Sequence, residues 1–427
     1  MMSPLAAAMA LFPAPRLRPW RRRGLLLALL GSFSLTGCKG VLELPNVLYL
    51  AMSTNSDQAI DADLLEETQA RLSVLERGYR QMHPASRFQF GLYSDNTISK
   101  ALIRRNRAGL GPDVIFVNGE TALRMLADGV VSPYPAAAEQ LKLFDPDDLD
   151  QLRNSRGELA GIPVVIQTQL ACFNRKRLPE PPATVTELLC QCCGEHCGAH
   201  RGPLLPVLEH RQPGALKGIN RAIAGQQPSP AEVRQIEQWL AWLQNANTQQ
   251  RVTFYSDQKS VIAEFLAERI DWMPCNSITL PKLRKQLGSS LGVSALPNGP
   301  DGSPPSPMKR LRVFALGSSS SAAGRARAIA FIRFSANPLM QRMLTVGSQT
   351  LLPANRFVKV PVQSSQVLAA MELSNRQSDQ FSQIVKLMHD DDPRVPKVQA
   401  LITELVFGEE SARSSTEALI QILRGKA

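Results

Sequence analysis

Short apolar runs that end in polar loops recur along the first third of the chain. Residues 47–52, 88–93 and 114–117 form such runs. Segments with apolar residues at helical spacing separate them, and the longest of these is 61–83. This order of strand, polar loop and helix predicts a doubly wound α/β layer, in which ligands bind at the carboxyl ends of the strands.

Later segments predict a second lobe. Two extended runs follow each other directly, at 162–167 and 168–174, and together they are long enough for a crossover between lobes. The other predicted elements are helices at 98–107, 232–243, 261–268 and 322–335, strands at 270–273, 293–296 and 311–316, and a mostly helical tail at 366–424.

The N-terminus predicts export and a lipid anchor. Arginines within 16–23 precede an apolar run at 24–33, which is too short to span a bilayer as a helix. The run ends in Leu-Thr-Gly-Cys38, which looks like a bacterial lipobox. We therefore expect 1–37 to be a signal peptide, Cys38 to be the acylated first residue of a periplasmic protein, and 38–46 to link it to the fold. The alternative is an ordinary signal peptide with a cysteine there by chance.

Net charge and composition argue against a nucleic-acid partner and against a membrane span after the N-terminus. The 427 residues include 48 basic and 37 acidic side chains, a net charge of +11. Five basic residues lie in the first 37 positions, so the rest of the chain carries 43 and a net charge of +6. This small excess does not predict a nucleic-acid partner. Hydrophobic residues make up 44%, enough for a sizeable core, and no apolar run after the N-terminus reaches the roughly 18 residues of a membrane span.

Several segments resemble one known family. They are GPDVIF at 111–116, GIPVVIQTQLACFNRKRL at 161–178, VSALPNGPDG at 293–302, AIAFIRFSANPLMQRMLTVGSQTLLPANR at 328–356 and FGEESARSSTEAL at 407–419. In this order the segments resemble an extracellular solute-binding protein of the sugar-type ABC importer family. The resemblance implies the type II periplasmic-binding-protein fold. That fold is α/β and two-lobed, each lobe a doubly wound sheet, with two or three hinge crossings that let the lobes close around a ligand.

The same resemblance implies lobe boundaries and partners. The first lobe would comprise 46–165 and 317–352, the second 169–311 and 356–427 with a Cys-rich insertion at 190–202, and the crossings 162–168, 312–315 and the stretch near Leu352-Pro353. The implied partners are a small-molecule solute and the transmembrane subunits of an ABC permease. The implied protein is a monomer without enzymatic activity or a cofactor.

Candidate ligand residues stand at the ends of the predicted strands. Sugar sites combine flat aromatic faces with planar polar groups. Residues of these types at loop ends and crossings are Ser53, Thr54, Asp57, Tyr93, Asp95, Asn118, Glu120, Gln167, Thr168, Trp272 and Asn276. For each of them a solvated loop position or a capping role is the alternative.

Tryptophan placement bears on the identity of the solute. Trp272 is the best candidate for stacking on a sugar, and burial in a strand core is its alternative. Trp239 and Trp242, at helical spacing, are predicted to be core. Family members that bind sugars usually carry Trp or Tyr just after this strand, where the chain has Cys275-Asn276. A small polar or zwitterionic solute, or a phosphorylated polyol, is therefore an alternative to a sugar.

Six cysteines remain besides Cys38. Four of them are close together, at Cys190, Cys192, Cys193 and Cys197, and the others are Cys172 and Cys275. In an oxidising compartment the cluster is predicted to form disulfides. Three of its members with His200 also match the spacing of a zinc site, C-x2-C-x3-C-x2-H, and reactive thiols are a third possibility. A metal-dependent enzyme built on this cluster is the alternative from a different functional class.

Two further motifs favour structural roles. Residues 288–292 match the G-x-S-x-G elbow of hydrolases, but a helix precedes them and a strand follows, the reverse of the order that the elbow needs. Residues 317–321 stand before the predicted helix at 322–335 and could hold an anion or cap the helix. Capping is the favoured interpretation because serine is common at that position.

Overall fold

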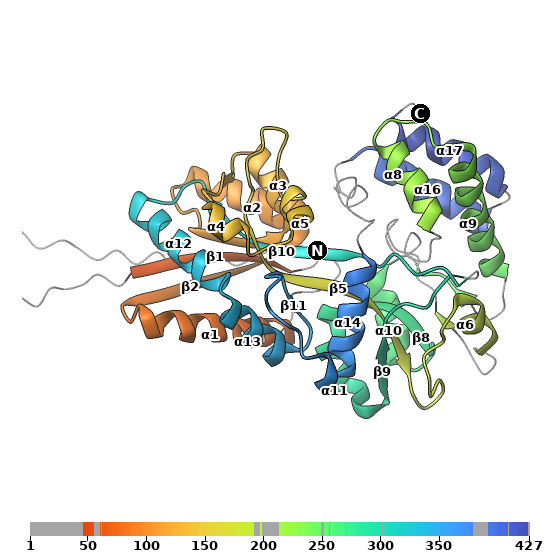
Figure 1. Cartoon of the computed structure of the whole chain (residues 1–427), viewed down its shortest axis with the longest axis horizontal. Helices are drawn as coiled ribbons and strands as arrows, with labels where there is room; N and C mark the ends of the chain where they lie inside the picture. The colour runs from red at the N-terminus through yellow and green to blue at the C-terminus, as the bar shows by residue number, and fades with distance from the viewer. Residues whose placement is uncertain are drawn as a thin grey trace, which may run out of the picture. The chain divides into compact units, whose positions relative to one another are not determined.

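The computed structural model describes residues 46–54, 60, 62–191, 197–198, 213–248, 252–255, 257–299, 302–378, 392–408 and 410–425 (Figure 1). The chain divides into two units, Met1–Leu44 and Pro45–Ala427, and all the described residues belong to the second unit. No helix in these ranges combines the length and the apolar character that crossing a bilayer requires.

The first lobe is built on a parallel sheet. Its elements are β1 (Asn46–Thr54), α1 (Ala62–Met82), β2 (Ser86–Ser94), α2 (Asp95–Arg107), β3 (Val114–Asn118), α3 (Gly119–Ala127), β4 (Val131–Ser132), α4 (Ala138–Leu141), α5 (Pro146–Asp150), α12 (Ala322–Ser335) and α13 (Pro338–Ser348). Strand β1 pairs in parallel with both β2 and β3. Helices α2 and α3 lie on one side of this sheet, and α1 and α13 lie on the other (Figure 1). The apolar run predicted at 47–52 is thus the middle strand of the lobe.

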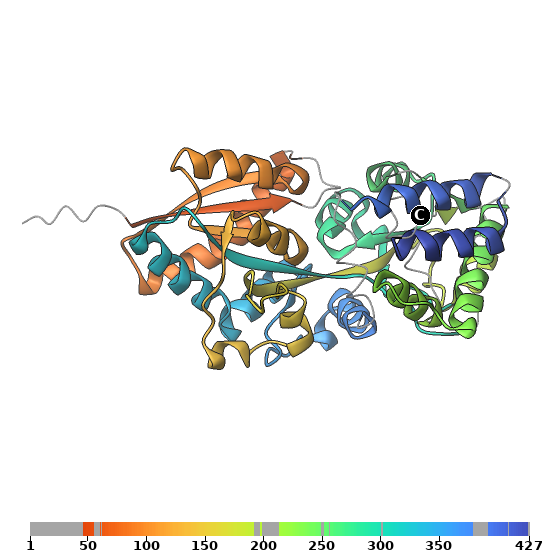
Figure 2. The same ribbon diagram turned by 90° about the horizontal axis from the view of Figure 1, so that it is seen from above.

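One long strand belongs to both lobes. Strand β5 (Ile162–Asn174) is continuous and buried throughout. Its first half pairs with β10 (Lys309–Gly317) and β11 (Leu352–Pro353), and its second half pairs with β8 (Trp272–Asn276) and β9 (Leu291–Ser294). Figure 2 shows β5 and β10 running side by side between the lobes. The two runs predicted in series are therefore a single strand, because each half finds its own pairing partners.

The second lobe combines a small antiparallel sheet with helices. Strand β5 lies between β8 and β9 and runs antiparallel to both. The remaining elements are α6 (Val185–Gln191), β6 (Cys197–Gly198), α8 (Pro213–Ile223), α9 (Pro230–Thr248), β7 (Val252–Thr253), α10 (Gln258–Leu266), η1 (Ser277–Thr279), α11 (Leu280–Leu287), η2 (Gly288–Ser290), η3 (Val362–Ser364), α14 (Gln366–Gln377), α16 (Arg394–Phe407) and α17 (Ala412–Leu423).

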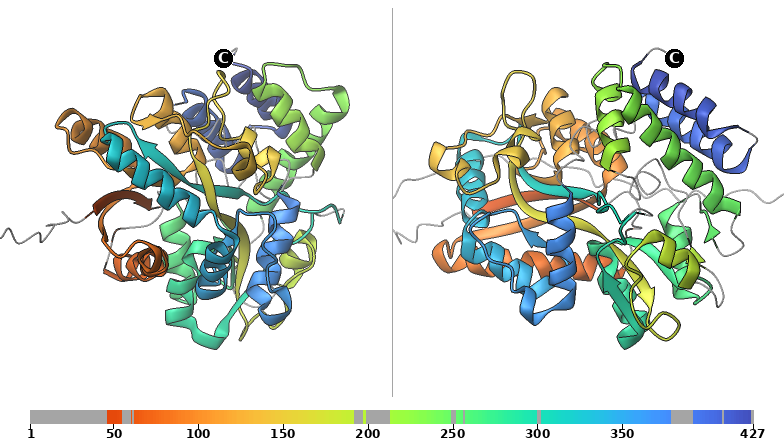
Figure 3. Two further views of the ribbon diagram at one scale, coloured as in Figure 1. Left: turned by 60° about the vertical axis from the view of Figure 1, so that its left-hand side comes forward. Right: turned by 45° about the vertical axis from the view of Figure 1, so that its right-hand side comes forward.

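Four helices form an apolar core of their own. Leu216 of α8, Trp239 of α9, Leu405 of α16 and Leu419 of α17 are buried together, and Trp242 packs against them. Figure 3 shows the four helices side by side, two in green and two in blue. The core position predicted for Trp239 is confirmed, whereas Trp242 is only partly buried against that core. Helices far apart in the sequence meet here because each has one apolar face to cover.

Strand β8 begins and ends later than predicted. The sequence predicts 270–273, whereas pairing with β5 places Trp272 opposite Phe173 and Asn276 opposite Gln169. Asp271 lies just before the strand, and its carboxylate lies 3.2 Å from the guanidinium of Arg177. The partner strand, rather than the local apolar pattern, decides where this strand ends.

Candidate functional site

A buried arginine, Arg312, joins the ends of β1 and β3. Antiparallel pairing of β10 with β3 sets Arg312 opposite Asn118. Its guanidinium donates through Nη1 to Asn118 Oδ1 (3.0 Å) and Ser53 Oγ (3.2 Å), and through Nη2 to the Ser53 carbonyl oxygen (2.5 Å). The side chain is only 3% exposed, so these bonds are shielded from bulk water. They tie the crossing strand to the carboxyl ends of the first-lobe sheet.

The surroundings of Arg312 preserve its positive charge. The guanidinium carbon lies 4.6 Å from the centroid of the Phe116 ring, an arrangement that favours a cation. Burial lowers the pKa of Arg312 to about 10, while the negative charges of Asp95 and Glu120 act in the opposite direction. With such a pKa the side chain is still positively charged at neutral pH. The site therefore contains a fixed positive centre.

Asn118 connects Arg312 to an acidic residue. The Asn118 Nδ2 group donates to Asp95 Oδ2 (3.0 Å), and Thr121 Oγ1 donates to Asp95 Oδ1 (3.4 Å). Asp95 is the first residue of α2, where a carboxylate interacts favourably with the positive end of the helix. The sequence predicts a loop at 94–96 and a helix from 98. That boundary is wrong, because the helix already begins at Asp95.

Two ion pairs lie just before Arg312 along β10. Arg310 lies 3.9 Å from Glu120, and Lys309 lies 2.6 Å from Asp148. None of these four side chains is more than 15% exposed. Burial raises the pKa of Glu120, and the positive charge of Arg310 opposes that shift. Strand β10 thus supplies three cations within four residues, and the first lobe supplies carboxylates beside them.

A cavity of about 80 Å³ lies next to this network. A single water needs roughly 10–15 Å³, so the cavity has room for several waters or a small solute. Most of the wall is Leu, Val, Phe and Met from α1, β1, β5, β10 and α13, with Ile278 from η1. The polar lining residues are Ser53, Thr54, Thr68, Arg71, Gln167 and Arg312.

Three of the predicted ligand residues line this cavity together. Ser53 and Thr54 come from the end of β1, and Gln167 comes from β5, opposite Arg310 in the strand pairing. Each is at most 7% exposed. Asp95, Asn118 and Glu120 do not line the cavity, but they surround Arg312, which does. The prediction that strand ends gather polar side chains at one place is therefore consistent with the structure.

A second arginine, Arg71 of α1, also lines the cavity. Its Nη2 group donates to Glu67 Oε1 and to Thr350 Oγ1 (3.1 Å). Burial lowers the pKa of Arg71, and the charge of Glu67 opposes that shift. The cavity therefore has apolar walls and two guanidinium groups, one of them partly neutralised by an adjacent carboxylate.

Tyr93 lies apart from the cavity. Its hydroxyl is 2.7 Å from the hydroxyl of Tyr49, and a Cβ atom on Gly91 would lie equally close to the Tyr49 hydroxyl. Glycine at position 91 thus leaves room for the tyrosine pair. Burial, together with this hydrogen bond, raises the pKa of Tyr49 well above its usual value. Tyr93 has a packing partner here rather than a place in the cavity lining.

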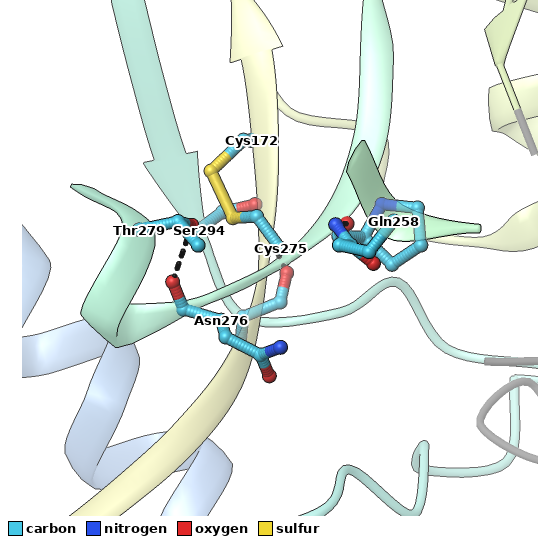
Figure 4. The surroundings of a disulfide bond; sticks show 8 residues. Cys172, Gln258, Cys275, Asn276, Thr279 and Ser294 are labelled. Carbon is cyan, nitrogen blue, oxygen red and sulfur yellow. Dashed lines mark hydrogen bonds between the residues drawn. A yellow bond between two sulfur atoms is a disulfide. The ribbon is translucent and has the colours of Figure 1, made fainter. Parts of the chain in front are cut away.

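Thr168 and Asn276 belong to the hinge and the second lobe. Thr168 is 1% exposed, and its backbone N–H donates to Ser277 Oγ (3.3 Å). The Asn276 carbonyl oxygen accepts from Thr279 Oγ1 (2.7 Å), while the Asn276 side chain points away from the nearby disulfide (Figure 4). Neither residue lines the cavity.

Trp272 lies in the core of the second lobe. Its side chain is 2% exposed and packs in a small apolar cluster with Phe173, Leu178 and Leu188. This is the strand-core position that the sequence left open as the alternative to stacking. Pairing with β5 turns the indole into that cluster, so we no longer include Trp272 among the proposed ligand residues.

A disulfide joins Cys172 of β5 to Cys275 of β8 (Figure 4). Both residues are at most 1% exposed, and the bond closes a sequence separation of 103 residues. The sequence alone did not pair these two cysteines. The spacing of the two cysteines in the sequence does not predict the disulfide, because only the antiparallel register of β5 and β8 brings them together.

Several predicted residues lie outside the described part of the chain. They are Cys38, Asp57, Cys192 and Cys193; for Cys190 and Cys197 only the backbone is described, in α6 and β6. The predicted disulfides of this cluster, and its zinc alternative with His200, therefore stay predictions. Within the described ranges, no group of three or more His, Cys, Asp or Glu is arranged to hold a metal ion.

The serines before α12 cap the helix, as the sequence favoured. Ser321 Oγ accepts from the Gly324 N–H (3.0 Å), and Ser320 Oγ donates to Asp113 Oδ1 (2.5 Å). Asp113 also accepts from the Tyr49 N–H through its other oxygen (3.0 Å). A carboxylate of the chain itself thus occupies the position at this helix start that an anion would take.

The arginines at the cavity were not predicted from the sequence. Arg310 and Arg312 alternate with apolar residues in a strand that is otherwise suited to the core, and two cations on one face of such a strand are an available signal. For Arg71 there was no comparable signal. Glu67 and Arg71, four residues apart on a helix, have the spacing of an ordinary surface pair.

Comparisons with known proteins bear on this arrangement. The family model for bacterial extracellular solute-binding proteins matches residues 87–367. That range includes β3, both crossing strands and most of the cavity lining. No curated protein matches the sequence.

Solved structures with the same fold are more informative about architecture than about ligand. The GacH receptor of Streptomyces glaucescens, solved unliganded and with acarbose, has a TM-score of 0.67 at 14% identity, over 90% of this chain and 99% of its own. The maltose-maltodextrin binding protein of Alicyclobacillus acidocaldarius has a TM-score of 0.61 at 16% identity, over 88% and 100%. A solute-binding protein of Thermotoga lettingae bound with α-D-tagatose has a TM-score of 0.61 at 13% identity, over 88% and 100%. These likenesses confirm the two-lobed α/β fold.

Proposed function

The chain belongs to the family of bacterial extracellular solute-binding proteins, and we propose that it is the substrate-binding lipoprotein of an ABC importer. In this role it captures a sugar or sugar-like polar solute and delivers it to a membrane permease. The observation that carries the proposal is the cavity in which Ser53, Thr54, Gln167 and Arg312 meet at the crossing strands.

The chemistry of the cavity suits a polyhydroxylated solute. Hydroxyl, amide and guanidinium groups pair with sugar hydroxyls as donors and acceptors in fixed directions. The apolar wall, including Phe116 and Leu92, suits the C–H face of a sugar ring. Ile278 follows β8, so residues of both lobes contribute to the wall. A solute that contacts both lobes stabilises a closed form relative to an open one.

We propose binding without catalysis. The titratable groups near the cavity, Arg312, Asp95, Glu120 and Arg71, are held in hydrogen bonds or beside opposite charges. Such an arrangement suits a rigid binding wall. The remaining parts of the proposal follow the resemblance: acylation of Cys38, a periplasmic location on the membrane, a monomer, and transmembrane permease subunits as partners.

A ligand panel tests the proposal. We would measure the thermal midpoint of the purified chain with maltose, maltotriose, acarbose and tagatose, and then measure the dissociation constant of the solute that gives the largest rise. Gln167→Ala should weaken binding roughly 2- to 10-fold, the effect of losing one hydrogen-bonding group. Gln89→Ala, at an exposed position of β2, is the matched control and should bind normally. Equal binding by both variants would remove Gln167 from the site.

A charged solute is the second candidate. Arg71 and Arg312 both line the cavity, whereas Phe116 and Phe314 are the aromatic residues among its described lining. Two cations complement a phosphate or carboxylate better than they complement a neutral sugar. A phosphorylated polyol or a zwitterion would then be the cargo. Glycerol phosphate and glycine betaine therefore belong in the panel, and a midpoint rise with one of them but none of the sugars would decide for this candidate.

A further inference from the structure

One edge of the first lobe lies far from the cavity, and the ends of several strands and helices meet there. Strands β1 and β2 begin side by side there, with Asn46 opposite Ser86 and Val47 opposite Arg87. Helix α1 ends at Met82, just before β2. Figure 1 shows β1 and β2 starting at the left of the sheet, with α12 above them. The cavity residue Ser53 is near the other end of β1.

The loop after α2 returns to the same edge. The Asp113 N–H donates to the Tyr49 carbonyl oxygen (2.9 Å), and Arg105 Nε donates to the Leu110 carbonyl oxygen (3.1 Å). The last turn of α2 and the loop that follows it therefore lie beside the start of β1. We call this surface the basic edge and define it by Arg80, Arg87, Arg104 and Arg107 with Val47, Met82 and Leu110.

The basic edge carries an excess of positive charge. Arg80, Arg87, Arg104 and Arg107 are all exposed. Among nearby acids, Glu76 lies 3.6 Å from Arg80, the Asp113 carboxylate is taken up by the Tyr49 N–H and Ser320, and Asp128 is exposed at the end of α3. Cations in the last turn of a helix are favourable by themselves, which accounts for part of the pattern. It does not account for Arg87, which is on a strand.

Large apolar side chains are exposed among these arginines. Met82 is 60% exposed, Leu110 is 61% exposed and Val47 is 41% exposed. Single exposed apolar residues are ordinary, but three at one basic edge match the pattern of surfaces that rest on lipid. In such surfaces, apolar side chains enter the interface and cations meet anionic headgroups.

The length of chain before β1 limits how far this edge can be from a membrane. Asn46 follows Cys38 by eight residues, and eight residues span at most about 29 Å in any conformation. If Cys38 is acylated, as proposed above, the basic edge is the part of the fold that the anchor holds near the bilayer. We propose that the basic edge docks on anionic phospholipid headgroups. The limit of about 29 Å applies only if Cys38 is anchored, whereas the charge and the exposed apolar residues do not depend on the anchor.

Docking in this way has a consequence for transport. Residues of β1 rise about 3.3 Å each, so Ser53, six residues beyond Val47, lies roughly 20 Å from the basic edge along the strand. A protein resting on this edge holds its cavity away from the lipid surface and open to dissolved solute. Contact with a permease then requires it to tip or lift, which anionic lipid would oppose.

Vesicle binding of the unacylated chain tests the docking separately from the anchor. The chain from residue 39 contains every residue of the three apolar cores, so it retains the folded unit. We would sediment it with vesicles of 30% phosphatidylglycerol in phosphatidylcholine and with pure phosphatidylcholine vesicles, at low and high salt. We expect binding to the anionic vesicles only, and its loss at high salt.

Charge variants locate the surface. Each arginine near an anionic surface contributes roughly fivefold to the partition coefficient. The variant Arg80→Gln/Arg87→Gln/Arg104→Gln/Arg107→Gln should therefore lose more than tenfold. Met82→Ser/Leu110→Ser should lose binding without changing its salt dependence. The matched control Lys176→Gln/Arg234→Gln/Lys282→Gln/Arg413→Gln removes the same charge from exposed positions elsewhere and should bind as the parent does.

Several results would overturn the proposal. They are equal binding to neutral vesicles, an equal loss in the control variant, no binding at all, or a preference for a soluble polyanion such as polyphosphate over the vesicles. The last result would make the basic edge a general polyanion site. Solute affinity measured on the same variants should not change, so failure of the docking proposal and failure of the solute-binding proposal are distinguishable.

Discussion

Arg312 and Asn118 face each other across β10 and β3, and the Arg312 guanidinium donates to the Asn118 side-chain oxygen over 3.0 Å. The Asn118 amide nitrogen in turn donates to Asp95. This relationship connects a crossing strand, the carboxyl end of β3 and the start of α2. It also holds Ser53, which lines the cavity, through two further bonds from the same guanidinium. The cavity wall therefore depends on a charge in the crossing strand.

Replacing Arg312 tests that dependence. Arg312→Met leaves the Asn118 and Ser53 oxygens without their donor in a buried site, and we expect the free energy of unfolding to fall by about 3–5 kcal/mol. Arg234→Met, at an exposed position of α9, should change it by less than about 0.5 kcal/mol. Urea unfolding of both variants measures the difference. Similar stability in the two would show that the network contributes little.

Trp272→Ala separates packing from ligand contact. The indole is buried beside Phe173 and Leu188, so its removal should lower the free energy of unfolding by about 3–5 kcal/mol. The fraction that stays folded should bind solute with normal affinity. Phe357→Ala is the control, because Phe357 is 61% exposed and should lose little stability. A stable Trp272→Ala protein with weakened solute binding would restore the stacking role.

The Cys172–Cys275 disulfide should contribute strongly to stability. It closes a separation of 103 residues, for which restriction of the unfolded chain predicts about 4–5 kcal/mol. We expect Cys172→Ala/Cys275→Ala to unfold at a much lower urea concentration than the parent. Counting thiols before and after reduction should show two fewer released in the variant than in the parent. An unchanged unfolding midpoint would mean that strand pairing alone holds β5 and β8 together.

Glu232 provides a test of pH dependence. The Ser229 N–H donates to Glu232 Oε2 (2.7 Å), and the Glu232 N–H donates to Ser229 Oγ (3.3 Å). The bond from the Ser229 backbone holds the pKa of Glu232 below its usual value of 4.5. Because the pKa is lower in the folded state than in the unfolded state, the ionised carboxylate stabilises the fold at every pH above the unfolded-state pKa. That contribution is lost as pH falls through the folded pKa.

The expected result is a pH-dependent effect of Glu232→Gln. At neutral pH the variant should be less stable than the parent by about 0.5–2 kcal/mol, the range of a helix cap. As the pH falls below 4.5 and through the lowered folded pKa, the difference should shrink, because the parent carboxylate becomes protonated. Glu417→Gln, at an exposed position of α17, is the control for charge alone. A difference that stays constant over this pH range would contradict the assigned direction of the pKa shift.

Acylation of Cys38 is tested by the mass of the protein purified from membranes. We expect the mature chain to begin at Cys38 and to carry a diacylglyceryl group and an acyl chain there. In high salt, which weakens docking of the basic edge, Cys38→Ser should release the protein from the membrane fraction, because the acyl chains are then the remaining attachment. An unmodified Cys38, or a mature chain that still contains Arg21, would be incompatible with the lipoprotein proposal.

Most elements of the fold could be predicted from local patterns. The helix predicted at 322–335 is α12 with the same bounds, and the run at 114–117 is β3 with one residue added. Periodicity works here because each element has one buried face or is buried entirely. Boundaries failed where tertiary contacts overrode the local pattern, at the start of α2 and at both ends of β8.

The candidate site was predicted in part. Ser53, Thr54 and Gln167 were found because the carboxyl ends of strands in an α/β sheet gather at one edge. Arg71 was not found, because its role depends on α1 packing against α13, which brings Arg71 to Thr350, and no local pattern carries that information. Trp272 was misplaced for the same reason. An indole in a strand is equally suited to a cleft or a core until the neighbouring strand is known.

By itself, the sequence determined the fold class, the order of the elements and the strand ends where a ligand could bind, because these depend on short-range periodicity and turn chemistry. Only the tertiary structure decided which side chains meet. Arg312 faces Asn118 because β10 runs antiparallel to β3, and Cys172 reaches Cys275 because β8 pairs with β5 in one register. The physical reason is that pairing between distant strands is set by the whole packed core. Side chains that are separate in the sequence become neighbours only when that core has formed.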